Sequence, residues 1–287
     1  MFRFTKILAV LFAVTLLAAA CGSDDDDGGD TAADAGDASC DAADLALEEP
    51  GTLTVATGEP VFPPWMIDDN PANQQGFESA LVYALAEELG VPEVAWTRTG
   101  FDEAIAPGEK AYDFNIQQYS ITPDRDEVVD FSDGYYVVEQ AIIGSPDNDI
   151  AGATSLGDLA DAQLGAAIGT TSLDYIDMVI QPSSEASVFD DNAAAKAAFD
   201  ASQVDGIVTD LPTAFFITAV EIPDASIIGV LPRTGDEPEE LGMLFEDGSA
   251  LVGCVNVALG SLRENGTIDA LEDEWLNDGG SIPSLEQ

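Results

Sequence analysis

The chain contains no histidine and few basic residues: its 287 residues include 8 Lys+Arg and 55 Asp+Glu, for a formal net charge of −47. Without histidine, Ser-His and Cys-His nucleophiles are excluded, as is the commonest metal ligand in proteins. The Walker loop, G-x-G-x-x-G and G-x-S-x-G motifs are also missing. Nucleic acids and anionic membranes would repel so acidic a protein, so neither is an expected partner. We therefore expect a non-enzymatic protein with no metal and no cofactor.

The one long apolar run, at 7–20, is too short for a stable membrane span and follows two basic residues. We interpret 1–21 as a secretory signal. The residues before Cys21 resemble a bacterial lipobox in which Ala18 replaces the usual leucine and Leu17 stands one place earlier. We expect Cys21 to be lipidated, and signal cleavage near Ala20 without a lipid is the alternative.

Large apolar side chains are scarce in 22–48, which consists mostly of Gly, Ser, Asp, Ala and Thr. Such a segment cannot offset its ordering entropy, and we expect a disordered acidic linker there. Cysteine is scarce as well: only Cys40 and Cys254 remain besides Cys21. In an exported protein these two cysteines indicate a disulfide, and the alternative is two unpaired thiols with Cys254 buried on a helix.

Beyond residue 50, strand-like and helix-like apolar patterns alternate along the chain. The patterns predict strands at 52–57, 94–97, 114–121, 128–131, 163–168 and 206–209, and a further apolar run lies at 137–144. They predict helices at 77–89, 101–106, 172–180, 193–201, 212–220, 251–262 and 268–276. This alternation is typical of α/β lobes with largely parallel sheets.

Arg125 lies just past a turn in the stretch DFNIQQYSITPDRDEVVDFSDGYY, at 113–136. Its planar guanidinium matches a carboxylate bidentately, which lysine cannot do. Ligands of α/β sheets bind beyond the carboxyl ends of strands, and Arg125, Thr171 and Asp210 each follow an expected strand. These positions favour binding roles, although a weak surface pair with a neighbouring acidic residue is the alternative for Arg125.

The segment SITPDRDEVVDFSDGYY resembles the signature of the family 3 extracellular solute-binding proteins, the receptors of ABC importers for polar amino acids. The resemblance spans roughly 51–275 and also includes FPPW, GFESALVYALAEELG, FDEAI, GDLADAQLGAAIGTTS, VDGIVTDLPTAFF and LRENGTIDALEDEW. It implies the type II periplasmic-binding-protein fold, an α/β fold of two lobes with a ligand cleft between them and a two-stranded hinge. We expect lobe 1 at 49–139 and 238–287, and lobe 2 with the hinge crossings at 140–237.

The same resemblance implies which residues bind a free amino acid. Arg125, with Ser120 beside it, would bind the ligand carboxylate, and Asp210 would bind the ammonium. Gln118 stands where the family usually has Gly or Ser. The expected ligand-binding residues are Glu59, Phe62, Phe101, Gln118, Ser120, Arg125, Thr170, Thr171 and Asp210. The alternatives are helix caps for Thr171 and Asp210 and plain core roles for the two phenylalanines.

Glu59 carries the prediction about the ligand's side chain. Resembled receptors for basic amino acids and glutamine often have an acidic residue at this position. The ligand's carboxylate and ammonium would neutralise Arg125 and Asp210, and the negative charge of Glu59 would remain without a partner. This favours arginine, lysine, ornithine or glutamine over acidic ligands. The alternative is that Glu59 points into solvent.

Together these features predict the substrate-binding lipoprotein of an ABC importer, a monomer anchored on the extracellular or periplasmic side of the bacterial cell membrane. Its partners would be a free amino acid and a membrane permease. A lyase of the cyclohexadienyl dehydratase type and a sensory domain are alternatives on the same scaffold. The missing histidine argues against the lyase, and the lack of a second membrane segment argues against the sensor.

Overall fold

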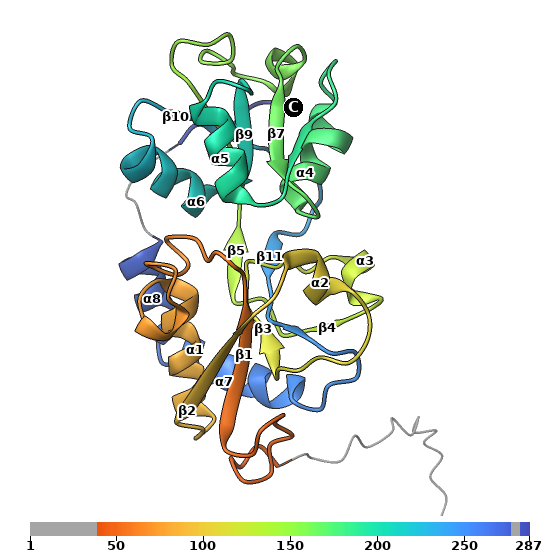
Figure 1. Cartoon of the computed structure of the whole chain (residues 1–287), viewed down its shortest axis with the longest axis vertical. Helices are drawn as coiled ribbons and strands as arrows, with labels where there is room; N and C mark the ends of the chain where they lie inside the picture. The colour runs from red at the N-terminus through yellow and green to blue at the C-terminus, as the bar shows by residue number, and fades with distance from the viewer. Residues whose placement is uncertain (1–38, 277–281) are drawn as a thin grey trace, which may run out of the picture. The chain divides into compact units, whose positions relative to one another are not determined.

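The computed structural model of the protein describes residues 39–276 and 282–287. The expected signal at 1–21, the lipidation site Cys21 and most of the linker at 22–48 lie outside the described residues. The described chain forms two α/β lobes, each with its own five-stranded sheet (Figure 1). No helix in this part of the chain has the length and apolar character needed to cross a membrane.

Lobe 1 is built on a sheet with the strand order β2-β1-β3-β12-β4. Its strands are β1 (Thr52–Thr57), β2 (Glu93–Arg98), β3 (Phe114–Asn115), β4 (Asp130–Phe131) and β12 (Leu244–Phe245). β1 pairs in parallel with β2 and β3, whereas β12 is antiparallel to β3 and β4. The sheet is therefore mixed rather than largely parallel, because the chain returns to it from lobe 2 through β12.

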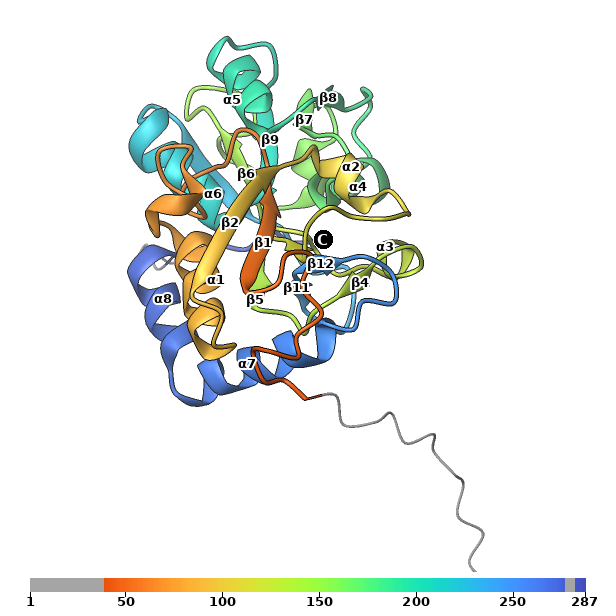
Figure 2. The ribbon, with the colours of Figure 1, turned by 60° about the horizontal axis from the view of Figure 1, so that its bottom comes forward.

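The helices of lobe 1 are α1 (Phe77–Glu88), α2 (Phe101–Ile105), α3 (Pro123–Asp126), α7 (Val252–Glu264) and α8 (Thr267–Trp275), with a 3-10 turn at Pro71–Asn73. In α1, Phe77, Leu81 and Leu85 recur every four residues and are fully buried, as expected for one face of an amphipathic helix. This face packs into the main core of the lobe with α7 and α8, and the three helices lie together in Figure 2.

Lobe 2 has a sheet with the strand order β10-β6-β9-β7-β8. Its strands are β6 (Gln140–Gly144), β7 (Leu164–Ala167), β8 (Ser187–Phe189), β9 (Gly206–Asp210) and β10 (Ser226–Val230). Its helices are α4 (Thr171–Tyr175), α5 (Asn192–Asp200) and α6 (Leu211–Phe216), with a 3-10 turn at Leu156–Leu159 and π-helical turns at Ile176–Ile180 and Ile217–Glu221. Two apolar clusters, one around Ile176 and one around Phe199, complete its core.

Two strands connect the lobes. β5 (Tyr136–Val138) leaves lobe 1 and β11 (Glu239–Leu241) returns to it, and the two pair antiparallel with Glu239 opposite Val138. Figure 1 shows this pair between the two sheets. The two lobes and the two-stranded hinge are the architecture that the sequence resemblance implied.

The strand expected at 114–121 is much shorter in the structure. β3 ends at Asn115, and Gln118 has a φ of 52°, in the left-handed region. A residue in that region cannot continue an extended strand, so the chain turns at Gln118 before it reaches Ser120.

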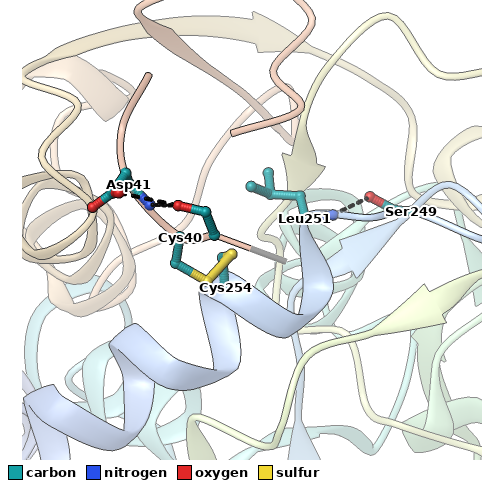
Figure 3. Close-up of a disulfide and its surroundings, with 6 residues drawn as sticks. Cys40, Asp41, Ser249, Leu251 and Cys254 are labelled. Carbon is teal, nitrogen blue, oxygen red and sulfur yellow. Dashed lines mark hydrogen bonds between the residues drawn. A yellow bond between two sulfur atoms is a disulfide. The ribbon is translucent and has the colours of Figure 1, made fainter. Parts of the chain in front are cut away.

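The end of the expected linker is part of the folded lobe. Leu45 and Leu47 pack against the lobe 1 core, and the backbone N–H of Glu48 donates to Asp113 Oδ1 at 2.7 Å. Cys40 and Cys254 form a disulfide that ties this segment to α7 (Figure 3). The linker prediction therefore extends too far, because apolar and covalent contacts hold residues 39–48.

The last residues, assigned to lobe 1 by the sequence, lie on lobe 2. The backbone N–H of Val230 donates to the Pro283 carbonyl at 3.0 Å, and that of Leu285 donates to the Val230 carbonyl at 2.9 Å. Leu285 is buried in the lobe 2 core above Gly229, where a Cβ atom would lie 2.8 Å from its side chain. The chain thus adds a short extended segment to the edge of β10.

We predict that Leu285→Ala lowers the free energy of unfolding by about 2–4 kcal/mol, because it removes a buried side chain and leaves a cavity. Urea unfolding followed by circular dichroism measures the change. Val257→Ala, at a position that is 67% exposed, is the matched control and should leave the stability nearly unchanged. An equal, small effect of both substitutions would contradict the docking of the last residues on lobe 2.

We also predict that Cys40 and Cys254 carry no free thiol in the purified protein. Alkylation without reductant, followed by peptide mapping, should leave both cysteines unlabelled, and prior reduction should label both. Labelling of the two residues without reduction would contradict the disulfide.

Candidate ligand-binding site

A cavity lies between the two lobes, beyond the carboxyl ends of β7 and β9. The predicted site residues that line it are Phe62, Phe101, Gln118, Ser120, Arg125, Thr170, Thr171 and Asp210. Glu59 does not line it. The structure therefore brings the expected residues together from both lobes, with that one exception.

Arg125 reaches the cavity from α3, whose first turn is capped by Thr122, and only 8% of the residue is exposed. Its Nη1 donates to the Ser120 carbonyl at 2.6 Å and its Nη2 to the Gly169 carbonyl of lobe 2 at 2.9 Å. The guanidinium carbon lies 5.5 Å from the centre of the Phe101 ring. No ion pair among the described residues involves Arg125, so the surface-pair alternative is not what the structure shows.

The charge of Arg125 is only partly compensated. Burial lowers the Arg125 pKa, and Tyr119, Asp174, Glu239 and Asp102 act in the opposite direction. A guanidinium has five N–H donors, and the two carbonyls use only two of them. The remaining donors and the uncompensated charge suit a carboxylate in the cavity.

The loop after β7 supplies the lobe 2 side of the site. Thr170 caps α4, because its hydroxyl accepts from the backbone N–H of Leu173 at 3.2 Å and donates to the Ala167 carbonyl at 2.7 Å. The hydroxyl of Thr171 does not cap the helix. It donates instead to Oε1 of Glu239 at 2.7 Å. The sequence had left open that Thr171 caps this helix, but the residue that caps it is Thr170.

Gly169 permits the close approach of the two lobes at this loop. Its φ is +71°, and a Cβ atom there would lie 2.1 Å from Oδ1 of Asp102, on α2 of lobe 1. A side chain there would be strained by the positive φ, and the Asp102 carboxylate would have to move aside.

Asp210 ends β9 and caps α6, since its Oδ1 accepts from the backbone N–H of Thr213 at 2.8 Å. The indole N–H of Trp65, in lobe 1, lies 3.0 Å from Thr213 Oγ1 and 3.3 Å from Asp210 Oδ1. Burial raises the Asp210 pKa, and the hydrogen bonds from Thr213 and Trp65 lower it in part. Asp210 is thus both a helix cap and a lining carboxylate. Trp65 belongs to the FPPW motif, but the sequence assigned a role only to Phe62.

Glu59 is exposed on the loop after β1, which corrects the sequence prediction. Asp69 and Arg98 hold this loop: Val61 N–H donates to Asp69 Oδ1 at 3.1 Å, and Arg98 donates to the Gly58 carbonyl. These contacts fix the backbone on either side of Glu59, and its carboxylate stays outside the cavity. The solvent-facing alternative is the one that the structure shows.

Gln118 is held by Glu78, a fully buried residue of α1 that the sequence did not suggest. The backbone N–H of Gln118 donates to Glu78 Oε1 at 2.8 Å, and the Gln118 side-chain amide donates to Oε2. The hydroxyl of Tyr135 also donates to this carboxylate. The amide of Gln118 is therefore tied back to α1, and the turn at Gln118 is stabilised by a residue 40 positions earlier.

Burial raises the Glu78 pKa from 4.5 to about 7, although the hydrogen bonds from Tyr135 and Gln118 lower it in part. Below pH 4.5 both the native and the unfolded carboxyl hold a proton. Between about 4.5 and 7 only the native one does. The free energy of unfolding therefore falls as the pH rises through this window.

We predict that Glu78→Gln removes this pH dependence. A shift of this size corresponds to roughly 3 kcal/mol, so between pH 5 and pH 8 the wild type should lose about that much more stability than the variant. Urea unfolding at the two pH values measures it. Glu87→Gln, on an exposed position of the same helix, is the control and should follow the wild type. A parallel pH dependence of Glu78→Gln and wild type would refute the prediction.

Several lining residues were missed from the sequence. They are Gln117, Gln140, Ser172, Asp190, Asp191, Asn192 and Thr209, together with the apolar Val138, Ala167, Ile168 and Leu241. Asp190 and Asp191 directly follow β8, just as Asp210 ends β9, so the rule about the carboxyl ends of strands applies to them as well. β8 has only three residues, too few for a strand pattern in the sequence, so nothing there indicated a strand end before Asp190.

Two α/β lobes joined by two strands, with charged and polar side chains on the cavity between them, are the arrangement expected of a solute-binding protein. Residues 53–278 match the bacterial extracellular solute-binding proteins, family 3, and the chain belongs to this family. The family is one of binding proteins, which confirms the expectation of a non-enzymatic protein.

Named relatives are amino-acid-binding proteins. The L-cystine-binding protein TcyJ of Escherichia coli (strain K12) is 25% identical over 232 residues, which are 80% of this chain and 84% of that protein. The ABC transporter arginine-binding protein 1 of Escherichia coli (strain K12) is 26% identical over 210 residues, or 70% of this chain and 81% of that protein. A solved structure of an ancestral arginine-binding protein bound to glutamine is 30% identical, with a TM-score of 0.69, over 80% of this chain and all of that one (100%).

Proposed function

We propose that the chain is the extracellular binding component of an ABC importer for a basic or amide amino acid, anchored to the bacterial cell membrane by a lipid on Cys21. The observation that carries the proposal is the placement of one buried guanidinium and one carboxylate, Arg125 and Asp210, on the same cavity. The family match and the names of the relatives support an imported amino acid. A membrane permease is the expected partner, and we expect a monomer.

Arg125 would bind the ligand's carboxylate and Asp210 its ammonium. Each of these protein charges is partly withdrawn from water, and an unpaired buried charge is costly. A free amino acid carries the two complementary charges on one carbon atom. Phe62 and Phe101 would cover the aliphatic part of its side chain, since both line the cavity. Closure of the lobes about β5 and β11 would exclude water.

The class of the ligand's side chain follows from the charged residues on the cavity wall that its carboxylate and ammonium leave unpaired. The charged lining residues are Arg125, Asp190, Asp191 and Asp210. A zwitterion matches Arg125 and Asp210, which leaves two carboxylates without a positive partner on the cavity wall: the exposed Asp190, and Asp191, whose Oδ1 caps α5 by accepting from the Ala194 N–H. These two carboxylates, rather than Glu59, would accept hydrogen bonds from a cationic or amide end. Arginine, lysine, ornithine and glutamine satisfy this requirement, whereas glutamate and aspartate do not.

A thermal-shift screen of the standard amino acids tests the proposal, because a ligand that binds the native state raises the melting temperature by mass action. We expect the largest shifts with arginine, lysine or glutamine and none with glutamate. The absence of a shift with every amino acid would contradict the proposed function. A largest shift with glutamate would contradict the role of Asp190 and Asp191.

We predict that Arg125→Lys weakens binding of the best ligand by about 2–3 kcal/mol, since a point charge replaces a planar fork of charged hydrogen bonds. Isothermal titration calorimetry measures the loss. Arg263→Lys is the matched control, because Arg263 is exposed and its contact is with the Gly134 carbonyl of lobe 1. Unchanged affinity of Arg125→Lys would remove Arg125 from the site.

A further inference from the structure

One carboxylate oxygen on the returning hinge strand joins the two lobes. Oε1 of Glu239, on β11, accepts hydrogen bonds from Ser120 Oγ of lobe 1 at 2.5 Å and from Thr171 Oγ1 of lobe 2 at 2.7 Å. Gln140 Nε2, at the start of β6, donates to the same oxygen at 3.2 Å. Ser120 and Thr171 are themselves 3.3 Å apart, so the contact lies where the lobes meet.

The hydrogen bonds to Glu239 determine which hydrogens Ser120 and Thr171 can still donate into the cavity. A hydroxyl group has one hydrogen, and a carboxylate can only accept. When the hydroxyl hydrogens of Ser120 and Thr171 point to Glu239, only oxygen lone pairs remain for the cavity that both residues line. In this arrangement neither hydroxyl can donate to a ligand carboxylate.

We propose that Glu239 is a positioning residue that competes, as an internal carboxylate, with the ligand's carboxylate for the hydroxyl groups of Ser120 and Thr171. The inference rests on the proposed function, because it takes Arg125 and these two hydroxyls as the carboxylate end of the site. It assigns Glu239 two effects: it holds the lobes together without a ligand, and it weakens the binding of the ligand's carboxylate.

The negative charge of Glu239 also opposes the binding of the ligand's carboxylate. Glu239 is one of the acidic groups that raise the Arg125 pKa against the larger lowering by burial, so its charge is felt at the guanidinium. A ligand carboxylate at Arg125 would therefore lie near a second carboxylate, and two like charges in a partly desolvated site repel each other. Arg125 would attract the ligand, and Glu239 would limit how tightly it is held.

Glu239→Gln is the substitution that separates these effects. Glutamine keeps the shape of the side chain but removes the charge, and its amide can donate to one hydroxyl, whose hydrogen is then free for a ligand. Glu240→Gln is the matched control. Glu240 is the next residue of β11, is exposed, and carries the same charge, but successive side chains of a strand point to opposite faces.

Two measurements test the inference on the purified full chain. Calorimetry with the amino acid that gives the largest thermal shift, starting with arginine and glutamine, should show binding to Glu239→Gln about fivefold tighter than to wild type. Small-angle scattering without a ligand should show a larger radius of gyration for Glu239→Gln, because a bridge between the lobes is weakened. Glu240→Gln should match the wild type in both measurements.

Tighter binding together with an expanded ligand-free protein supports the inference. Unchanged or weaker binding by Glu239→Gln overturns it, because Glu239 would then support the bound state rather than compete with the ligand. An unchanged radius of gyration overturns it as well. If no amino acid binds the wild type, the proposed function fails, and the scattering comparison alone decides whether Glu239 holds the lobes together.

Discussion

The burial of one guanidinium between two lobes is the constraint on which the site depends. Arg125 has lost most of its water, and the carbonyls of Ser120 and Gly169 replace part of it. The second of these contacts crosses between the lobes, and it comes from Gly169, whose φ of +71° favours glycine. The charge that remains uncompensated is the physical reason why this cavity suits an anion at one end.

In a chain with a net charge of −47, the carboxylates of Glu78, Asp210 and Glu239 are each met by hydrogen-bond donors. Glu78 accepts from Gln118 and Tyr135, and Asp210 accepts from Thr213 and Trp65. Glu239 accepts from hydroxyls of both lobes. Withdrawing an unpaired carboxylate from water is costly, so these donors decide which acidic side chains face inward and which, like Glu59, stay in solvent.

Local sequence patterns were sufficient to predict those helices and strands whose buried residues recur regularly within the element itself. The four-residue repeat of α1 and the apolar run of β9 lie where the sequence analysis expected them. The patterns failed where a distant residue decides the conformation. The chain does not stay extended as far as Ile121 because Glu78 stabilises a left-handed turn at Gln118, and the last residues join lobe 2 because Leu285 fits above Gly229.

The sequence by itself determined the α/β class, the two-lobed family and eight of the residues that line the cavity, because strand ends and motif spacing can be recognised along the chain. Only the tertiary structure decided that Glu59 stays outside the site and that Glu239 joins the two lobes. Asp69 and Arg98 hold the loop of Glu59 outward, and hydroxyls from both lobes meet Glu239. The direction of a side chain on a loop or a hinge strand depends on partners far away in the sequence, and folding alone brings those partners together.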